Sequence, residues 1–152
     1  MARILILEDD YELASSWRDA FESRKHEVDL ALSSSEAIAY TTEATYDLFV
    51  VDLYIPSFPG YHDSGRIFLQ ELKNSLSPNE IATKCIGTSG LRIGKTTDAA
   101  QLLFSSYGVT NFLEKPFTPE KLVKTAEELL PEIDHATSSI LDAVQQSQAK
   151  NN

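Results

Sequence analysis

Short, unbroken apolar runs that each end in polar residues constrain the fold of this chain more than any other feature. The run Ile4–Leu7 ends at Glu8, and the run Leu48–Val51 ends at Asp52. Weaker runs occupy residues 85–86 and 109–113, and residues 28–32 are a plausible second strand. An apolar run without polar alternation is typical of a strand buried on both faces, so these runs predict a parallel sheet.

Between the runs, apolar residues recur at helical spacing. This spacing predicts helices over residues 11–24, 34–43, 65–76 and 96–106, and a fifth helix after Thr118. Thr118 is a suitable N-cap, because Pro119 and Glu120 follow it at the first helical positions. Strand and helix alternate five times. The fold class is therefore α/β, with a doubly wound, five-stranded parallel sheet and helices on both faces.

Polar side chains follow four of the predicted strands. They are Glu8 and Asp9 after the first strand, Asp52 after the third, Ser89 after the fourth and Lys115 after the fifth. Right-handed crossovers bring the carboxyl ends of all parallel strands to one edge of the sheet. Open α/β sheets bind ligands at that edge, so we expect these side chains to converge there.

Such a set suits the chemistry of a phosphoryl group. Clustered carboxylates repel one another unless a cation lies among them, and Mg²⁺ prefers oxygen ligands of this kind. The lysine and the serine hydroxyl would stabilise phosphoryl oxygens. An aspartate carboxylate is a competent nucleophile for phosphoryl transfer.

These residues carry a resemblance to a known family. The residues Ile4 to Asp10, Asp52 with Pro56, Ser89-Gly90 and Lys115-Pro116-Phe117 together resemble the receiver domain of two-component response regulators. The resemblance covers about residues 1–130 and implies the flavodoxin-like form of the predicted fold. It also implies a phosphorylation-controlled signalling switch rather than an enzyme.

The resemblance assigns a role to each residue of the set. Asp52 is the implied phosphoacceptor, and Lys115 pairs with the phosphoryl oxygens. The implied Mg²⁺ ligands are Glu8, Asp9, Asp52 and the backbone carbonyl of Tyr54. Ser89 would bond the phosphoryl group and move on activation, and Phe112 occupies the aromatic switch position, although ordinary core packing explains a phenylalanine there equally well.

The chain departs from the family pattern in two loops. Asp63-Ser64-Gly65 suits the start of the third helix better than Gly60, so we expect an insertion within residues 57–62. The segment between Ser89 and Lys115 is also long, around residues 92–95. Both loops would lie beside the phosphorylation site.

Composition limits the partners. The formal net charge is −10, and Lys and Arg form no cluster, which argues against direct binding to nucleic acid or anionic lipid. The single cysteine, Cys85, excludes an internal disulfide. No apolar run is long enough to span a bilayer, and the first residues lack a signal peptide, so we expect a cytoplasmic protein with no membrane contact.

Residues 131–152 form a separate segment after the receiver domain of residues 1–130. Ile133, Thr137, Ile140, Leu141 and Val144 give this segment an amphipathic stripe. It is read as a partner-binding or dimerising helix, a helix folded onto its own domain, or a frayed end that serves as a linker.

We therefore expect a receiver that accepts a phosphoryl group from a histidine kinase or a histidine phosphotransfer protein and acts on a downstream protein partner. One alternative is a pseudo-receiver that serves only as a scaffold. The other is a phosphatase with an aspartyl-phosphate intermediate, which usually carries a second aspartate where this chain has Tyr54. A flavin-binding flavodoxin is disfavoured, because Glu8, Asp9 and Asp10 would repel a bound phosphate.

Overall fold

A computed structural model describes residues 1–53, 65–90 and 96–130. Five parallel strands form one sheet in the order β2-β1-β3-β4-β5. The strands are β1 (Arg3–Leu7), β2 (Glu27–Ala31), β3 (Leu48–Asp52), β4 (Cys85–Ser89) and β5 (Asn111–Glu114). This topology confirms the predicted doubly wound sheet.

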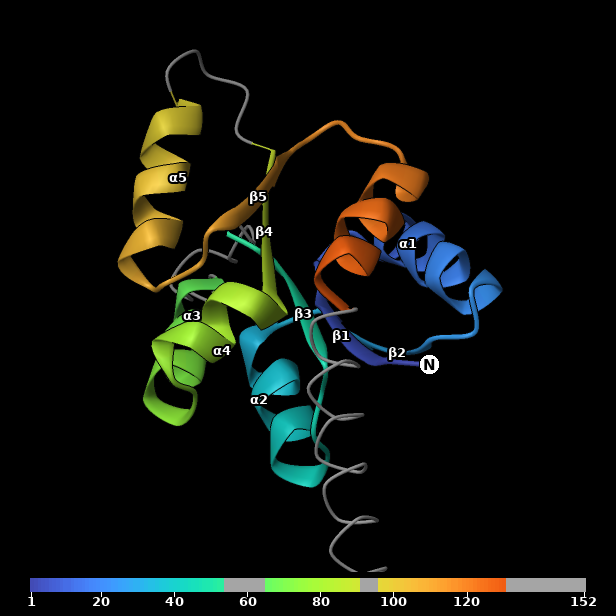
Figure 1. Cartoon of the computed structure of the whole chain (residues 1–152), viewed down its shortest axis with the longest axis horizontal. Helices are drawn as coiled ribbons and strands as arrows, with labels where there is room; N and C mark the ends of the chain where they lie inside the picture. The colour runs from blue at the N-terminus through green and yellow to red at the C-terminus, as the bar shows by residue number, and fades with distance from the viewer. Residues whose placement is uncertain (54–64, 91–95, 131–152) are drawn as a thin grey trace, which may run out of the picture.

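Helices cover both faces of the sheet (Figure 1). Within the described residues they are α1 (Tyr11–Ser23), α2 (Ser34–Glu43), α3 (Gly65–Ser75), α4 (Pro78–Lys84), α5 (Thr96–Ser106) and a helix over residues 119–130. Helix α1 and the helix 119–130 lie side by side on one face, and α2, α3 and α5 cover the other. No helix in these described ranges combines the length and apolarity needed to cross a membrane.

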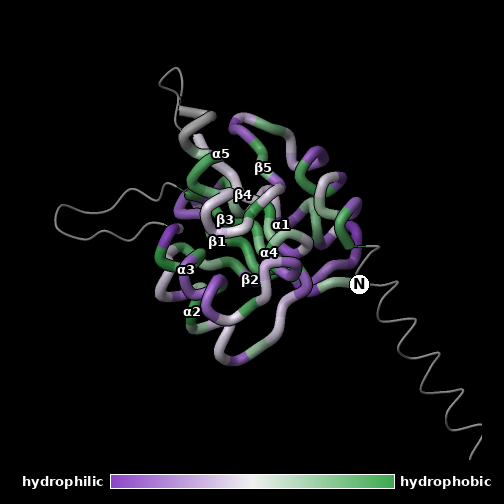
Figure 2. Tube along the Cα trace, turned by 60° about the vertical axis from the view of Figure 1, so that its left-hand side comes forward, coloured by the Kyte–Doolittle hydropathy of each residue, from purple (hydrophilic) through white to green (hydrophobic). Residues whose placement is uncertain are grey.

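The core has two layers because successive residues of a strand point to opposite faces of the sheet. On the face of α1, residues such as Ile6 and Val50 pack with Phe21 and Leu122. On the opposite face, Leu5, Leu7, Phe49 and Val51 pack with Phe68 and Phe104. Figure 2 shows the resulting hydrophobic strands at the centre of the domain.

Most bounds agree with the sequence prediction to within one residue, and two larger differences remain. The seven-residue helix α4 was not predicted, although Ser77 caps it and Pro78 occupies its first turn, because Ile81 is its only buried residue. Strand β5 begins at Asn111 rather than at residue 109. The Val109 amide instead donates to the Phe104 carbonyl at 3.0 Å and closes the end of α5.

Candidate functional site

The carboxyl edge of the sheet brings Glu8, Asp52 and Lys115 together. Glu8 directly follows β1, Asp52 is the last residue of β3, and Lys115 directly follows β5. Each of the three lies two positions beyond a core residue of the α1 face, namely Ile6, Val50 and Leu113. Strand alternation therefore directs all three side chains toward that face of the sheet.

Lys115 links the two buried carboxylates. Its Nζ lies 2.6 Å from Oε2 of Glu8 and 3.4 Å from Oδ1 of Asp52. Glu8 is 1% exposed and Asp52 is 2% exposed. The aliphatic part of the lysine passes Gly90, where an added Cβ would lie 3.2 Å from Cδ of Lys115. The ammonium is thus held between two charges that solvent barely reaches.

Burial changes the titration of these groups. Burial, and then the charge of Glu8, raises the pKa of Asp52 to about 7. Burial also raises the pKa of Glu8, although the bond from Lys115 opposes this effect. Burial by itself lowers the pKa of Lys115, but the charges of Asp52 and Glu8 outweigh it and the pKa is raised. The lysine is therefore a fixed positive charge, whereas Asp52 titrates near neutral pH.

The donor set fits a divalent cation. Carboxylate oxygens of Glu8, Asp9 and Asp52 lie within 4.8 Å of one another. Oδ1 of Asp52 is buried and has no hydrogen-bond partner among the described residues. Clustered carboxylate oxygens of this kind are what Mg²⁺ binds in proteins. Tyr54, the fourth expected ligand, lies outside the described residues.

Asp10, the third acidic residue of the run, has another role. Its carboxylate accepts a hydrogen bond from the Leu13 amide at 3.1 Å and caps α1. Its own amide donates to Oε1 of Glu8 at 3.2 Å. The N-terminus of α1 and the Glu8 carboxylate are therefore positioned by the same turn.

Two hydroxyl residues end β4 beside the acidic edge. Ser89 is buried, and its carbonyl accepts a hydrogen bond from the Lys115 amide at 2.9 Å. Thr88 pairs in register with Asp52, and its hydroxyl is buried without a hydrogen-bond partner in the described part of the chain. Alternation places Ser89 on the same face as Gly87 and Thr88 on the face toward which Asp52 points.

Phe112 lies on the face of α5. Its ring packs against Phe104 with a centroid distance of 5.5 Å and an interplanar angle of 50°. Phe104 in turn covers Gly87, where an added Cβ would lie 2.7 Å from the ring. Phe112 is only partly buried. The aromatic pair therefore packs beside Gly87, which lies two residues before Ser89 on β4.

Sequence reasoning read Gly65 only as the start of a helix and missed its contact with the site. A Cβ on Gly65 would collide with the carbonyl oxygen of Asp52. Helix α3 therefore begins directly against the end of β3, at a distance that only glycine permits. A glycine at the first helical position was the available signal. The expected insertions, within 57–62 and around 92–95, lie outside the described residues.

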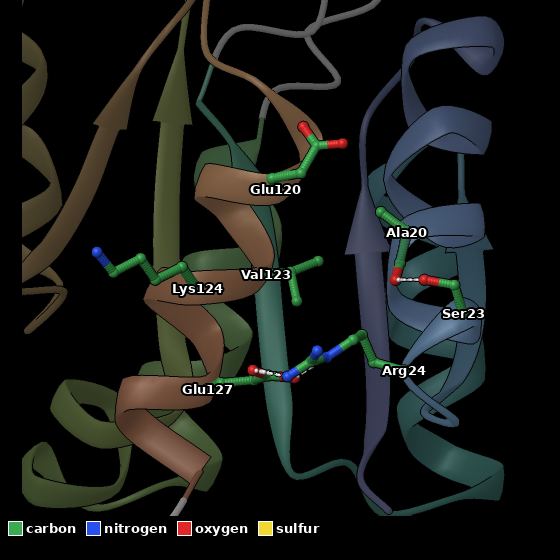
Figure 3. Close-up of a pocket in the computed structure, with 7 residues that line it drawn as sticks. All are labelled: Ala20, Ser23, Arg24, Glu120, Val123, Lys124 and Glu127. Carbon is green, nitrogen blue, oxygen red and sulfur yellow. Dashed lines mark hydrogen bonds and ion pairs between the residues drawn. The ribbon is translucent and has the colours of Figure 1, made fainter.

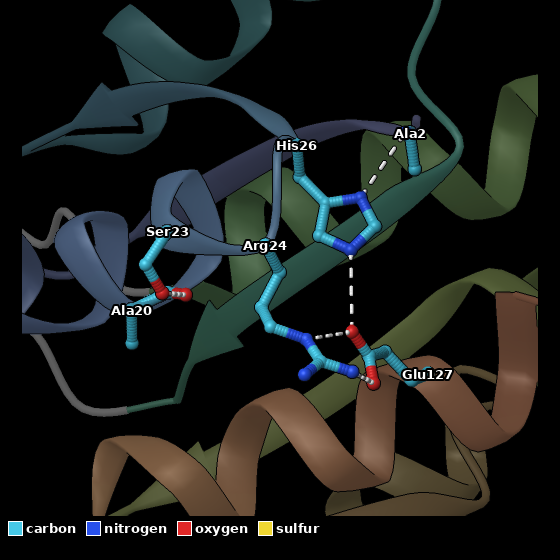
Figure 4. Close-up of polar contacts among 6 residues, drawn as sticks. All are labelled: Ala2, Ala20, Ser23, Arg24, His26 and Glu127. Carbon is cyan, nitrogen blue, oxygen red and sulfur yellow. Dashed lines mark hydrogen bonds and ion pairs between the residues drawn. The ribbon is translucent and has the colours of Figure 1, made fainter.

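A second polar cluster joins α1 to the helix 119–130. In a groove of about 380 Å³, Arg24 donates two hydrogen bonds to Glu127, at 2.8 and 2.9 Å (Figure 3). His26 lies 3.6 Å from Glu127 and accepts a hydrogen bond from the Ala2 amide at 3.1 Å (Figure 4). Ala2 and His26 precede β1 and β2, so this cluster lies at the opposite end of the sheet from Asp52.

The fold and the acidic, lysine-containing edge define a class of protein, the doubly wound α/β domains with a site at the carboxyl edge of the sheet. The chain belongs to the family of response regulator receiver domains, whose sequence profile matches residues 4–127. Members of this family are the phospho-aspartate switches of two-component systems. The predicted resemblance is thereby confirmed.

Curated relatives include the response regulator ArlR of Staphylococcus saprophyticus, which is 26% identical over 130 residues, or 86% of this chain and 53% of that protein. The transcriptional regulatory protein ResD of Bacillus subtilis is 28% identical over 128 residues, or 84% of this chain and 48% of that protein. The chain thus spans about half the length of the curated relatives it matches.

Solved structures show the same fold. A CheY-like receiver domain protein from Methanospirillum hungatei is 20% identical with a TM-score of 0.72, covering 90% of this chain and 98% of that one. The chemotaxis protein CheY4 of Vibrio cholerae is 22% identical with a TM-score of 0.67, covering 85% and 98%. At this identity the likeness concerns the fold alone.

Proposed function

We propose that this chain accepts a phosphoryl group on Asp52 from a phosphohistidine of a histidine kinase or a histidine phosphotransfer protein. One observation carries the proposal. Asp52 is buried between the carboxylates of Glu8 and Asp9 and the ammonium of Lys115, and Oδ1 has no hydrogen-bond partner in the described ranges. The anionic nucleophile is Asp52, the cation-binding pair is Glu8 and Asp9, and the fixed positive charge is Lys115. All of these groups face the same point.

In the proposed reaction, a carboxylate oxygen of Asp52 attacks phosphorus in line with the phosphorus–nitrogen bond. That bond breaks, and its electron pair leaves with the imidazole nitrogen, which then holds a proton from solvent. Lys115 neutralises charge on the transferred oxygens. Mg²⁺ bound by Glu8, Asp9, Asp52 and the Tyr54 carbonyl would offset the negative charge of the site and keep Asp52 ionised at neutral pH.

The added charge would then act on Ser89 and Phe112. The added charge would pull the Ser89 hydroxyl, which alternation places on the other face of β4 from Asp52, toward the phosphoryl group, and Phe112 would change its packing against Phe104. Phe112 lies on β5, and the surface over α5, β5 and the helix 119–130 would change its affinity for a downstream protein partner. The net charge of −10 disfavours binding to nucleic acid, so the chain itself would act through protein contacts.

Intact-mass measurement after incubation with acetyl phosphate tests the proposal. The wild type should gain one phosphoryl group when Mg²⁺ is present, and Asp52→Asn should gain none. Asp19→Asn, at an exposed position on α1, is the matched control and should label normally. Labelling of Asp52→Asn to the wild-type extent would contradict the assignment. If the wild type takes up no phosphoryl group and binds no Mg²⁺, the domain is a pseudo-receiver scaffold.

The proposal extends to residues 131–152, which lie outside the described residues. We propose that residues 1–130 form the receiver and that the apolar stripe of the following segment joins two copies of the chain. Deletion of residues 132–152 should then lower the association state in sedimentation experiments. Unchanged sedimentation would contradict the dimer and leave the segment as a linker or a frayed end.

A further inference from the structure

The single tryptophan of the chain lies against Lys115. Trp17, on α1, is 1% exposed, and Nζ of Lys115 lies 5.6 Å from the centroid of its ring. The same ring stacks on Phe117, with centroids 5.3 Å apart and an interplanar angle of 18°. The indole therefore contacts both the first and the last residue of the segment Lys115-Pro116-Phe117.

Core packing alone does not account for a tryptophan at this position. Leu13, Trp17 and Phe21 follow helical spacing on the core face of α1, and that spacing requires only an apolar side chain at each position. The indole Nε1 of Trp17 is buried and has no hydrogen-bond partner within the described ranges. Burying an N–H group without a partner costs free energy that leucine would avoid. What tryptophan adds is a ring face that attracts a cation.

A bound cation would weaken the shortest contact of Lys115, because that contact is to a metal-binding carboxylate. Oε2 of Glu8 accepts from Lys115, and Oε1 accepts from the Asp10 amide, so both oxygens of Glu8 are in use. A cation among Glu8, Asp9 and Asp52 competes with the ammonium for Oε2. Of the contacts described above, the ammonium then keeps Asp52 and the ring of Trp17.

We infer that Trp17 is a positioning residue, whose ring face holds the Lys115 ammonium beside Asp52 when Glu8 binds a cation. This inference rests on the proposed roles of Asp52 and Lys115. The Lys115 ammonium would then already lie in place to contact the phosphoryl oxygens, and it would not have to move in from solvent. Phe117 supports the arrangement by stacking on the same indole.

Three variants separate a cation–ring contact from simple core filling. Trp17→Leu removes the ring, Trp17→Phe keeps a smaller ring, and Lys115→Met keeps the aliphatic stem without the charge. Each Trp17 variant is also made in the Lys115→Met background, which gives two double variants. The first readout is the dissociation constant of beryllofluoride with Mg²⁺ present. We expect Trp17→Leu to weaken binding by about three- to thirtyfold and Trp17→Phe by less, from the usual strength of a buried cation–ring contact. In the Lys115→Met background neither change should matter.

The second readout requires neither phosphorylation nor a metal. The ε-methylene protons of Lys115 should show an upfield ring-current shift in carbon–proton NMR spectra of the metal-free wild type. The shift should persist in part in Trp17→Phe and vanish in Trp17→Leu. Should Trp17→Leu fail to fold, Trp17→Phe with Lys115→Met completes the comparison.

Each outcome decides the matter. Equal weakening by Trp17→Leu in both lysine backgrounds would overturn the inference and leave Trp17 as a core residue. A ring-current shift without any effect on beryllofluoride binding would also overturn it. If the wild type binds no beryllofluoride while the shift is present, the proposed function has failed rather than the Trp17 contact.

Discussion

The ammonium of Lys115 lies closer to Glu8, at 2.6 Å, than to Asp52, at 3.4 Å. The lysine therefore pairs first with a carboxylate of the cation-binding set and only second with the proposed nucleophile. When all are ionised, the three carboxylates Glu8, Asp9 and Asp52 and this one ammonium leave two negative charges at the edge of the sheet. That excess matches one divalent cation, which is consistent with Mg²⁺ at this site.

Removing the charge of Glu8 should lower the pKa of Asp52. Its charge is the second-largest cause of the raised pKa after burial, and in Glu8→Gln the ammonium of Lys115 would also be freed for Asp52. Asp9→Asn should lower the same pKa by less, because the charge of Asp9 raises the pKa of Asp52 less than the charge of Glu8 does. Carbon-13 NMR titration of the Asp52 carboxyl group, without metal, measures both. A pKa unchanged by Glu8→Gln would mean that burial alone raises it.

Asp52→Asn should stabilise the metal-free domain above neutral pH. The native pKa of Asp52, about 7, lies above the ordinary value of 3.8, so the native state holds its proton more tightly than the unfolded state. Stability therefore falls as pH rises from about 4 to about 7. Asp52→Asn does not undergo this fall in the free energy of unfolding, which is on the order of 2–4 kcal/mol. Urea unfolding at pH 5 and pH 8 should show a gain that grows with pH.

Glu43→Gln, at an exposed position on α2, is the control for Asp52→Asn, because it removes one negative charge far from the acidic edge. Its stability should follow the wild type at both pH values. A constant difference between Asp52→Asn and the wild type across this range would contradict a raised native pKa.

Gly65→Ala should destabilise the domain more than Gly90→Ala does. The added Cβ at Gly65 meets the backbone carbonyl of Asp52, which cannot move without shifting β3, and overpacking of this kind costs about 1–3 kcal/mol. At Gly90 the added Cβ meets only the flexible stem of Lys115, at 3.2 Å. Thermal unfolding compares the two. Similar melting temperatures would mean that α3 does not press against Asp52.

Gly90→Ala should instead affect the site. A displaced lysine stem moves the ammonium away from Asp52, so phosphorylation by acetyl phosphate should slow while the melting temperature changes little. A normal rate would show that Lys115 adapts to the added methyl group.

Glu127→Gln should lower the free energy of unfolding only slightly, and it should do so only above acidic pH. The hydrogen bond from Arg24 lowers the pKa of Glu127, so the ion pair stabilises the fold at neutral pH and loses its effect as pH falls through that lowered pKa. Arg24 and Glu127 are solvent-accessible, so the expected loss is below about 1 kcal/mol. Urea unfolding at pH 7 and at successively lower pH should show a difference at pH 7 that shrinks as the pH falls.

Much of the domain followed from the sequence because both signals involved are local. Apolar runs, unbroken in β1 and β3 and weaker elsewhere, predicted the five strands, and helical spacing predicted every major helix. A strand buried on both faces and a helix buried on one face leave different periodicities in the sequence. The order of these elements then determined the topology, because crossovers between parallel strands have one hand. Placing Glu8, Asp52 and Lys115 at one edge required no more than this.

The tertiary structure alone decided which contacts those residues make. No spacing along the chain indicates that Lys115 pairs with Glu8, 107 positions away, or that Trp17 on α1 covers its ammonium. The clash that only Gly65 avoids with Asp52 is equally invisible in the sequence. Distances between side chains on separate elements depend on how the helices pack on the sheet, and local periodicity carries no information about that packing.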